Sequence, residues 1–413
     1  MLSARDIIVI SSIEWDFNWQ GHQEIARRLA LSGNRVLYVE NMGVRTPGLR
    51  DARRVVGRAS KWVRSLPLDG VREVLPNLHV CSPLVLPPFG SKARQLLNRR
   101  VLLPLIRHAV EKLNFRSDII WTYLPTDTGA SLIQLLRKPD GLTVYYCIAD
   151  FAELTPFAEA MIQSERSIIE MSDVVFAQCK QLAERCSRRG KGVGIFPFGV
   201  NLDLFTPTDN LGKRELQKGM IETSEPALIS AMMSKLPRPV IGYVGGIHRH
   251  FDTKMLAAMA HAKPDWSWVL IGPVQTPLNS LEQTPNVHLL GSKAHKELPE
   301  YIANIDVGIV PYLRNEYTMT VVPTKINEYL AMGKPVVSTD LPQVRVFNDE
   351  HDVLIMSPNT TGAFLACIES ALSLPSGEAI IARRREVAAL SDWDTRIERM
   401  SNLLEQALLA RKG

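Results

Sequence analysis

The 413-residue sequence has few cysteines and no long apolar run. Its five cysteines form no C-x-x-C pair and leave an odd one over, which argues against a disulfide framework and a zinc site. The first residues lack the basic start, long apolar stretch and cleavage site of a signal peptide. No apolar segment is close in length to the about 18 residues that a membrane-spanning helix needs. We therefore expect a cytoplasmic protein, either soluble or peripheral on the cytoplasmic face of the membrane.

Basic residues gather in one part of the chain. Residues 45–116 hold fifteen Lys or Arg against four Asp or Glu, and the remainder is slightly acidic. Within this basic arm, the apolar residues of 49–66 recur at helical spacing and arginines fill the other face, as in helices that lie on anionic membranes. Alternatively, this segment and a second basic stretch, 92–112, pack on the N-terminal sheet. No aromatic platform accompanies the charge, so we expect no nucleic-acid partner.

Short apolar runs alternate with helical stretches, which is typical of parallel α/β units. The expected strands are 6–12, 34–40, 77–83, 118–124, 142–150, 173–178 and 193–200, then 240–246, 267–273, 287–291, 306–312, 335–339 and 353–356. Residues 206–238 interrupt this alternation. The pattern predicts two doubly wound Rossmann-like domains, 1–205 and 206–413, with a linker at 206–238 and a final helix at 391–413 that can pack back on the first domain. Ligands of such sheets bind beyond the carboxyl ends of the strands, here in an interdomain cleft.

The most informative window is 310–339. A strand is expected to end at Tyr312, and a helix to begin near Pro323 and end at Gly333. The start of such a helix offers free N–H groups and a positive dipole end, which suit a diphosphate. Lys325 can meet phosphate oxygens, and Glu328 can accept hydrogen bonds from ribose hydroxyls. Because the two residues lie three apart, a simple surface ion pair is the alternative.

Several motifs carry a family resemblance. Pro323-Thr-Lys-Ile-Asn-Glu-Tyr-Leu-Ala-Met-Gly-Lys-Pro-Val-Val-Ser338 resembles the donor site of GT-B glycosyltransferases of family 4, the glycosyl transferases group 1 type. Pro311-Tyr-Leu-Arg-Asn-Glu-Tyr-Thr318 resembles the bacterial surface-polysaccharide branch. Residues 15–40, 197–205 and 239–246 are similar to the family's first strand-loop-helix-strand, to the segment closing its N-terminal domain and to the glycine-bearing turn opening its donor domain. The resemblance spans the chain apart from the basic arm and the linker.

The resemblance implies a metal-independent hexosyltransferase that needs no cofactor and uses a UDP- or GDP-linked sugar. The acceptor would be a glycan or a lipid-linked glycan, with retention of the anomer. The implied donor-binding residues are Gly245, Gly246, Arg249, Asn315, Glu316, Thr318, Lys325 and Glu328.

The sequence departs from the family pattern at two places. The first glutamate of the usual E-x7-E pair is replaced by Thr320, so that Glu316 is the nearby candidate for a contact with the donor sugar. The usual Arg and Lys after the first donor-domain strand are replaced by Gly246 and by Phe251 or Asp252. Backbone N–H groups of 245–247, with Arg249 or Lys325, are then expected to meet the diphosphate.

Two residues are candidates for the acceptor side. Asp150 closes an expected strand and His22 follows the first one, so either can orient or deprotonate an acceptor hydroxyl. Alternatively, Asp150 caps the next helix and His22 is an ordinary helix-start residue. His248 and His250 have no third ligand at metal spacing. Two other functions stay open: a nucleotide-sugar 2-epimerase and an inactive GT-B partner subunit.

Overall fold

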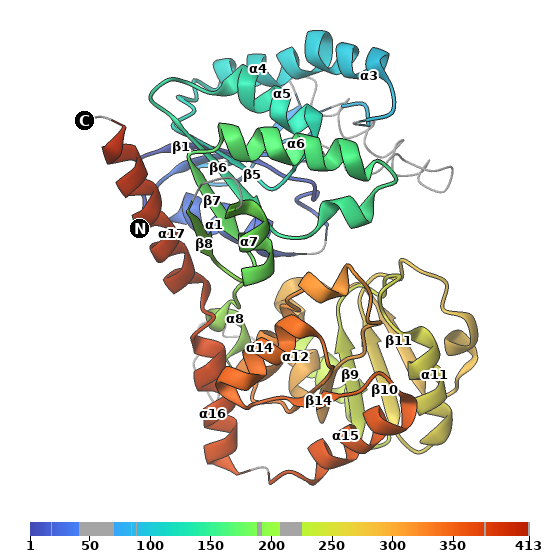
Figure 1. Cartoon of the computed structure of the whole chain (residues 1–413). Coiled ribbons are helices and arrows are strands. Elements are labelled where there is room, and N and C mark those ends of the chain that lie inside the picture. The colour runs from blue at the N-terminus through green and yellow to red at the C-terminus, as the bar shows by residue number, and fades with distance from the viewer. Residues whose placement is uncertain are drawn as a thin grey trace. The chain divides into compact units, whose positions relative to one another are not determined.

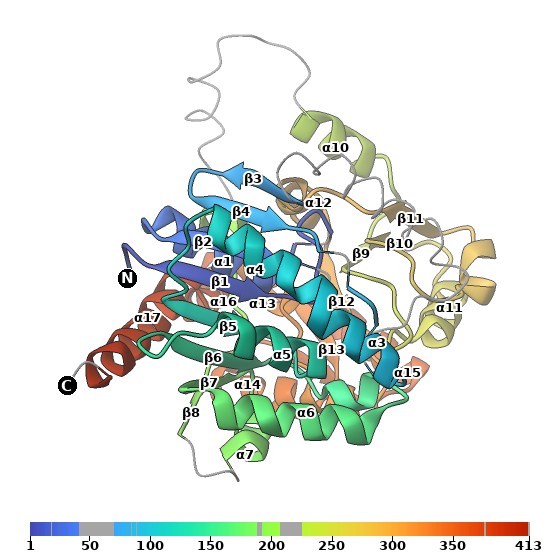
Figure 2. The same ribbon diagram turned by 90° about the horizontal axis from the view of Figure 1, so that it is seen from above.

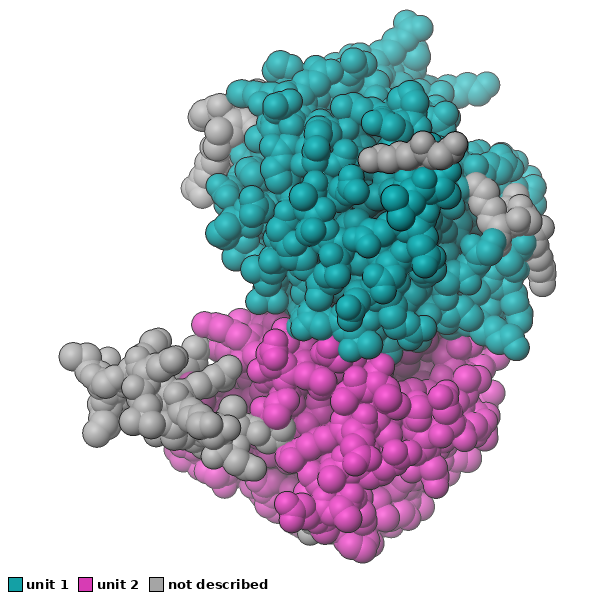
Figure 3. Space-filling model, turned by 90° about the vertical axis from the view of Figure 1, so that its left-hand side faces the viewer, with its two compact units in different colours: residues 1–197, 394–413 teal, residues 198–393 magenta. Residues whose placement is uncertain are grey.

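The computed structural model describes residues 1–17, 19–40, 70–83, 85–87, 89–187, 192–206, 225–375 and 377–411. Segment 49–66, expected to form the membrane-binding helix, and residues 207–224 of the expected linker lie outside these ranges. The chain divides into two compact units (Figure 3): unit 1 comprises Met1–Pro197 and Asp394–Gly413, and unit 2 comprises Phe198–Trp393. The first division therefore falls at Pro197–Phe198, not at the expected 205–206.

Unit 1 is built on a sheet with strand order β3-β4-β2-β1-β5-β6-β7-β8. Its strands are β1 Asp6–Ile10, β2 Arg35–Val39, β3 Val71–Leu75, β4 Leu78–Cys81, β5 Ile119–Thr122, β6 Leu142–Cys147, β7 Val174–Ala177 and β8 Val193–Ile195. Neighbours pair in parallel except β3 and β4, which are antiparallel. Every residue of β1, β5 and β6 is buried, as in strands covered on both faces.

The helices of unit 1 flank this sheet, and Figure 1 shows α4, α5 and α6 side by side over it. They are α1 Gly21–Leu31, α3 Lys92–Leu97, the π-helical turn η3 Asn98–Leu102, α4 Leu103–Lys112, α5 Asp127–Leu136, the 3₁₀ turn η4 Phe151–Leu154, α6 Ala158–Met171 and α7 Lys180–Ser187. The last helix, α17 Trp393–Ala410, contributes to unit 1 from Asp394 onward. Asp394 forms an ion pair with Arg28, and Arg411 lies 3.1 Å from the carboxylate of Asp173.

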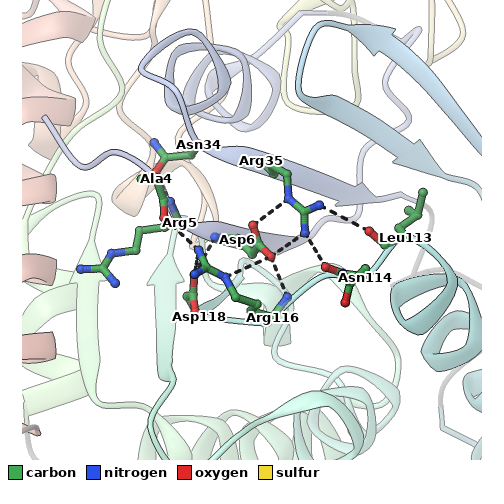
Figure 4. Close-up of polar contacts among 9 residues, drawn as sticks. All are labelled: Ala4, Arg5, Asp6, Asn34, Arg35, Leu113, Asn114, Arg116 and Asp118. Atoms are coloured by element: carbon green, nitrogen blue, oxygen red, sulfur yellow. Dashed lines mark hydrogen bonds and ion pairs between the residues drawn. The ribbon is translucent and has the colours of Figure 1, made fainter.

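A polar network fixes the amino-terminal edge of the unit 1 sheet (Figure 4). Both carboxylate oxygens of Asp6 accept from the guanidinium of Arg35, at 2.8 and 2.6 Å, and the Arg116 N–H donates to the same group at 2.7 Å. Burial by itself would raise the pKa of Asp6, but the bonds and charges of the two arginines outweigh it, so the pKa is lowered. This ionic anchor lies at the edge opposite to the carboxyl ends of the strands.

Unit 2 is built on a wholly parallel sheet with strand order β11-β10-β9-β12-β13-β14. Its strands are β9 Val240–Val244, β10 Ser267–Ile271, β11 Val287–Gly291, β12 Val307–Val310, β13 Val336–Thr339 and β14 Ile355–Ser357. Counted along the unit, this is the Rossmann order 3-2-1-4-5-6, whose switch point lies between β9 and β12.

The helices of unit 2 are α8 Leu202–Phe205, α10 Glu225–Met233, α11 Thr253–Ala262, α12 Leu298–Ala303, α13 Lys325–Ala331, α14 Pro342–His351, α15 Thr361–Ser373 and α16 Glu378–Ala389. Short 3₁₀ turns are η5 Asn279–Gln283, η6 His295–Glu297 and η7 Thr318–Thr320. Helix α13 ends at Ala331, and Gly333 follows its C-cap at φ +74°, the C′ position expected for this glycine. It begins at Lys325, however, so Pro323 precedes the helix and does not occupy its first turn.

Candidate functional site

The carboxyl ends of β9 and β12 meet at the switch point of unit 2. Gly245 follows β9 with φ +142°, and Gly272 follows β10 with φ +144°. A Cβ on Gly272 would lie 2.1 Å from the carbonyl oxygen of Gly245, so the two turns touch backbone to backbone. The N–H groups of Gly245 and Ile247 donate to Ile271 and Pro273, which leaves only Gly246 with an N–H free for a ligand among 245–247. In this conformation, two of the three N–H groups expected near the diphosphate are thus already bonded to the backbone.

Lys325, the first residue of α13, points into this switch point. It is buried at 8% exposure, and its Nζ donates to the hydroxyl of Tyr312 at 2.5 Å. The same Nζ lies 5.0 Å from the ring centre of Tyr243 and 4.8 Å from that of Tyr312, within cation–π range. A Cβ on Gly245 would lie 2.9 Å from Lys325 Cε, so the glycine makes room for the lysine. Among the described residues, Lys325 forms no ion pair with a carboxylate.

Helix α13 is fixed in place by Tyr329. The N–H of Val244 donates to the Tyr329 hydroxyl at 2.7 Å, which ties the helix to the end of β9. The ring lies so close to β12 that a Cβ on Gly308 would come within 2.6 Å of it. These contacts set the position from which Lys325 reaches the switch point.

Two histidines extend the site beyond β9. The ring of His248 lies 5.2 Å from that of Tyr312, and burial together with the charge of Lys325 lowers the pKa of His248 to about 3. His250 stacks on Tyr317 with ring centres 4.3 Å apart. Its Nε2 lies 3.1 Å from Nε of Arg249, and its Nδ1 lies 3.0 Å from Nδ2 of Asn315. Neutral His248 therefore adds no positive charge to the site at physiological pH.

The loop after β12 brings Asn315 to the site but uses Thr318 internally. The Thr318 hydroxyl donates to the carbonyl of Leu313 at 2.7 Å and accepts from the N–H of Asn315 at 2.9 Å. The Thr318 side chain is fully buried, so in this conformation it shapes the loop and cannot touch a ligand. Glu316 points outward and is exposed.

Glu328 has a different partner from Lys325. Its carboxylate is 3.6 Å from Nε2 of His295 and forms no ion pair with Lys325 in the described part of the chain. His295 in turn packs edge-on against Phe205, at 5.3 Å between ring centres. The alternative of a simple i,i+3 ion pair is thus not what the structure shows.

In unit 1, His22 is enclosed. It is the second residue of α1, fully buried, and stacks on the ring of Tyr123 at 3.8 Å. Its Nδ1 lies 2.8 Å from the hydroxyl of Ser11, which lies 2.7 Å from the hydroxyl of Tyr38. Burial lowers the pKa of His22 to about 3. The imidazole is therefore neutral and, in this conformation, out of reach of an acceptor.

Asp150 is half-buried just beyond the end of β6. One carboxylate oxygen accepts from the N–H of Ala152 at 3.2 Å and caps η4, while the other lies 2.5 Å from Nη1 of Arg185. Arg185 also donates to Glu165 at 2.9 Å, and Tyr145 donates to that same glutamate oxygen at 2.6 Å. Asp150 thus caps the next helical turn, which was the alternative drawn from the sequence. It also forms an ion pair with the guanidinium of Arg185.

The sequence did not single out the aromatic residues of the site. Tyr243 and Tyr312 stand at the carboxyl ends of β9 and β12, and this position within two apolar runs was the available signal. The sequence held no signal for a role of Arg185, because this residue lies in an ordinary polar helix. No group of three or more His, Cys, Asp or Glu placed to hold a metal ion occurs in the described ranges. No single described helix is long and apolar enough to cross a membrane. Helices α15 and α16, which are joined by a sharp bend, reach that length and apolar composition only when taken together.

Comparison with known proteins shows what the chain is similar to. Residues 238–373 match the family model described as glycosyl transferases group 1. Over 250 residues the chain is 35% identical to the putative teichuronic acid biosynthesis glycosyltransferase TuaH of Bacillus subtilis (strain 168). That match spans 58% of this chain and 59% of TuaH, so it leaves about two fifths of each protein uncompared.

Solved structures match along almost the whole chain. Sucrose-phosphate synthase from Thermosynechococcus elongatus superposes with a TM-score of 0.69 at 17% identity, covering 98% of this chain and 100% of that one. Anabaena HepE, solved in complex with UDP, gives a TM-score of 0.63 at 14% identity, with 97% and 100% covered. At such identities the likeness establishes the fold. The chain has the GT-B fold, and its residues 238–373 match the family model of the glycosyl transferases group 1.

Proposed function

We propose that this protein is a glycosyltransferase that moves a sugar from a nucleotide-sugar donor to a glycan or lipid-linked acceptor in bacterial surface-polysaccharide biosynthesis. The family match of residues 238–373 supports the reaction class, and the TuaH likeness supports the polysaccharide context. HepE was solved with UDP and with UDP-glucose, which favours a UDP-linked donor over a GDP-linked one. Metal independence and retention of the anomer remain part of the proposal.

One observation carries the assignment of the donor site. Lys325 carries a buried ammonium group. Among the described residues, its hydrogen-bond partner is the uncharged hydroxyl of Tyr312. Buried charges in proteins are normally paired, because an uncompensated one loses its hydration without return. The missing partner is an anion at the switch point of a Rossmann sheet, where nucleotide phosphates bind. A donor diphosphate meets this requirement, with the free N–H of Gly246 as a second contact.

The remaining residues take roles around that diphosphate. Glu328 accepts hydrogen bonds from the ribose, with His295 beside it. Arg249, Asn315 and exposed Glu316 line the donor-sugar side. Thr318 contributes by holding their loop.

On the acceptor side, we propose that Asp150 orients the acceptor hydroxyl. Its carboxylate is partly exposed and is held by Arg185. His22 is enclosed and supports the loop after β1 instead of acting on the acceptor.

Binding and turnover together test the proposal. Calorimetric titration with UDP, GDP and ADP identifies the nucleotide, and the matching sugar nucleotide is then incubated with and without a lipid-linked glycan. Release of nucleoside diphosphate that depends on the glycan is the expected result. A new sugar epimer without acceptor would identify the 2-epimerase, and binding without any reaction would identify an inactive partner subunit.

A further inference from the structure

The segment from Lys92 to Lys112 forms one long rod on the outside of unit 1 (Figure 2). It consists of α3, the π-helical turn η3 and α4, and it packs against α5. Four large apolar side chains along it are exposed: Leu96 at 51%, Leu97 at 44%, Val101 at 49% and Leu105 at 51%. Isolated exposed apolar side chains are ordinary, but four of them within ten residues of one rod form an apolar stripe.

The π-helical turn explains why the stripe stays on the outside. One extra residue in a helix rotates everything after it by about 100° relative to a regular α-helix. With this rotation, Asn98 at the start of the turn and Leu103, Ile106 and Val110 after it share the buried face. Asn98 is fixed there by the backbone of Leu86, with bonds of 2.9 and 3.0 Å. Leu105 consequently continues the stripe begun by Leu96 and Leu97.

The same rod carries six basic residues, of which Arg99 donates to the hydroxyl of Ser131 on α5 at 2.9 Å. They are Lys92, Arg94, Arg99, Arg100, Arg107 and Lys112. The rod has a single acidic residue, Glu111, which accepts from Nε of Arg107 at 2.7 Å. Pro104 is the second residue of α4 and donates no N–H to the preceding turn, and it directly follows the π-helical turn.

We propose that the outer face of residues 92–112 docks this protein on an anionic lipid surface. The stripe of leucine and valine fits the acyl boundary, and the arginines and lysines fit lipid phosphates. A protein partner of matching charge would need acidic side chains around an apolar groove, whereas a bilayer supplies both features over any area. The inference rests on the proposed transfer to a lipid-linked acceptor, since docking would bring unit 1 to such an acceptor. Docking itself requires neither donor nor transfer.

Co-sedimentation of the full chain with vesicles tests this surface, using phosphatidylcholine with and without phosphatidylglycerol. Binding is expected only with phosphatidylglycerol, and it should fall at least tenfold as salt rises from 50 to 500 mM. The triple variants Leu97→Gln/Val101→Gln/Leu105→Gln and Arg99→Gln/Arg100→Gln/Arg107→Gln should each lower the bound fraction at least fivefold. Because the altered side chains are exposed, circular dichroism and melting temperature should match those of the unaltered chain.

Matched controls alter residues of the same types elsewhere in unit 1. Leu31→Gln/Leu403→Gln/Leu409→Gln changes exposed leucines of α1 and α17, and it should bind as the unaltered chain does. A further variant, Arg53→Glu/Arg54→Glu/Arg58→Glu, addresses the other basic segment, 49–66. The proposal is overturned if the chain fails to bind phosphatidylglycerol vesicles at low salt. It is equally overturned if only the 49–66 variant loses binding. Intact docking with no glycan-dependent turnover would instead count against the proposed function alone.

Discussion

The ammonium group of Lys325 lies 2.5 Å from the phenol oxygen of Tyr312, and these two side chains join helix α13 to the end of β12. A phenol can accept this hydrogen bond but carries no negative charge, and within the described ranges no carboxylate pairs with Lys325. In the proposed function this pair receives the anionic diphosphate, so donor binding would depend on residues from two elements.

Replacing Lys325 with Met should weaken binding of the nucleoside diphosphate at least tenfold, or about 1.4 kcal/mol, because the cation is lost from a buried site. The affinity for the free nucleoside should stay unchanged, since it carries no phosphate. Calorimetry with both ligands measures the two effects. Lys254→Met, on the exposed face of α11, is the control. Equal diphosphate affinity in the Lys325 and Lys254 variants would contradict the assignment.

The two glycines after β9 should respond differently to alanine. A Cβ on Gly245 would lie 2.9 Å from Lys325 Cε at a left-handed φ, whereas one on Gly246 would lie 3.3 Å from the flexible end of Gln275. We expect Gly245→Ala to weaken diphosphate binding more than Gly246→Ala, because only the former displaces the lysine. Titration of both variants with nucleoside and nucleoside diphosphate compares them. Parallel losses for the two ligands would indicate general disruption of unit 2.

Glu328→Gln should raise the donor Kd about tenfold if the carboxylate binds the ribose. A 2′-deoxy nucleotide gives the sharper comparison, since the unaltered protein should prefer the ribose form and the variant should not. The exposed Glu316, changed to Gln, serves as the matched control for nucleotide affinity. An unchanged preference for ribose in Glu328→Gln would remove this role.

Asp150→Asn should lower kcat about a hundredfold or more while the donor Kd stays constant, as expected when a group acts on the acceptor hydroxyl. Its bonds to Ala152 and Arg185 give it a structural role that must be separated from this effect. Melting temperature and kcat are therefore measured together. Normal turnover in a variant that melts earlier would show that Asp150 only caps η4 and pairs with Arg185.

The buried His22 makes the stability of unit 1 depend on pH. Because its pKa in the folded protein is about 3, the unfolded chain binds a proton below about pH 6.5 that the folded chain does not. Stability should therefore fall by about 1.4 kcal/mol for each pH unit between pH 6 and pH 4. His22→Gln should reduce this slope in urea unfolding of the chain, followed by tryptophan fluorescence. An unaltered slope would mean that other groups set the acid sensitivity.

Much of the fold followed from the sequence because buried parallel strands are near-continuous apolar runs. All thirteen expected strands occur, with ends shifted by a few residues. Strand β3 was missed because its sequence, Val-Arg-Glu-Val-Leu, is short and half polar, as suits an antiparallel edge strand.

The site was less accessible to sequence reasoning. Lys325 and Glu328 stood out through their motif, but the tyrosines that hold Lys325 come from positions far apart in the chain. Their convergence is a product of the strand order. His22 lies at a helix start, where exposure is the usual outcome, and its burial depends on packing against Tyr123, which the local sequence does not encode.

The return of the chain to unit 1 at Asp394 has a consequence for synthesis on the ribosome. Arg28 and Asp173 belong to the first half of the chain, yet their partners Asp394 and Arg411 emerge only after all of unit 2. At about 5–20 residues per second, the nascent sheet of unit 1 waits roughly 10 to 40 s for its last helix. Unit 2 is thus the first of the two units whose residues have all been synthesised. The strands of unit 1, which are synthesised first, would therefore have the greatest need of a chaperone that protects the growing chain.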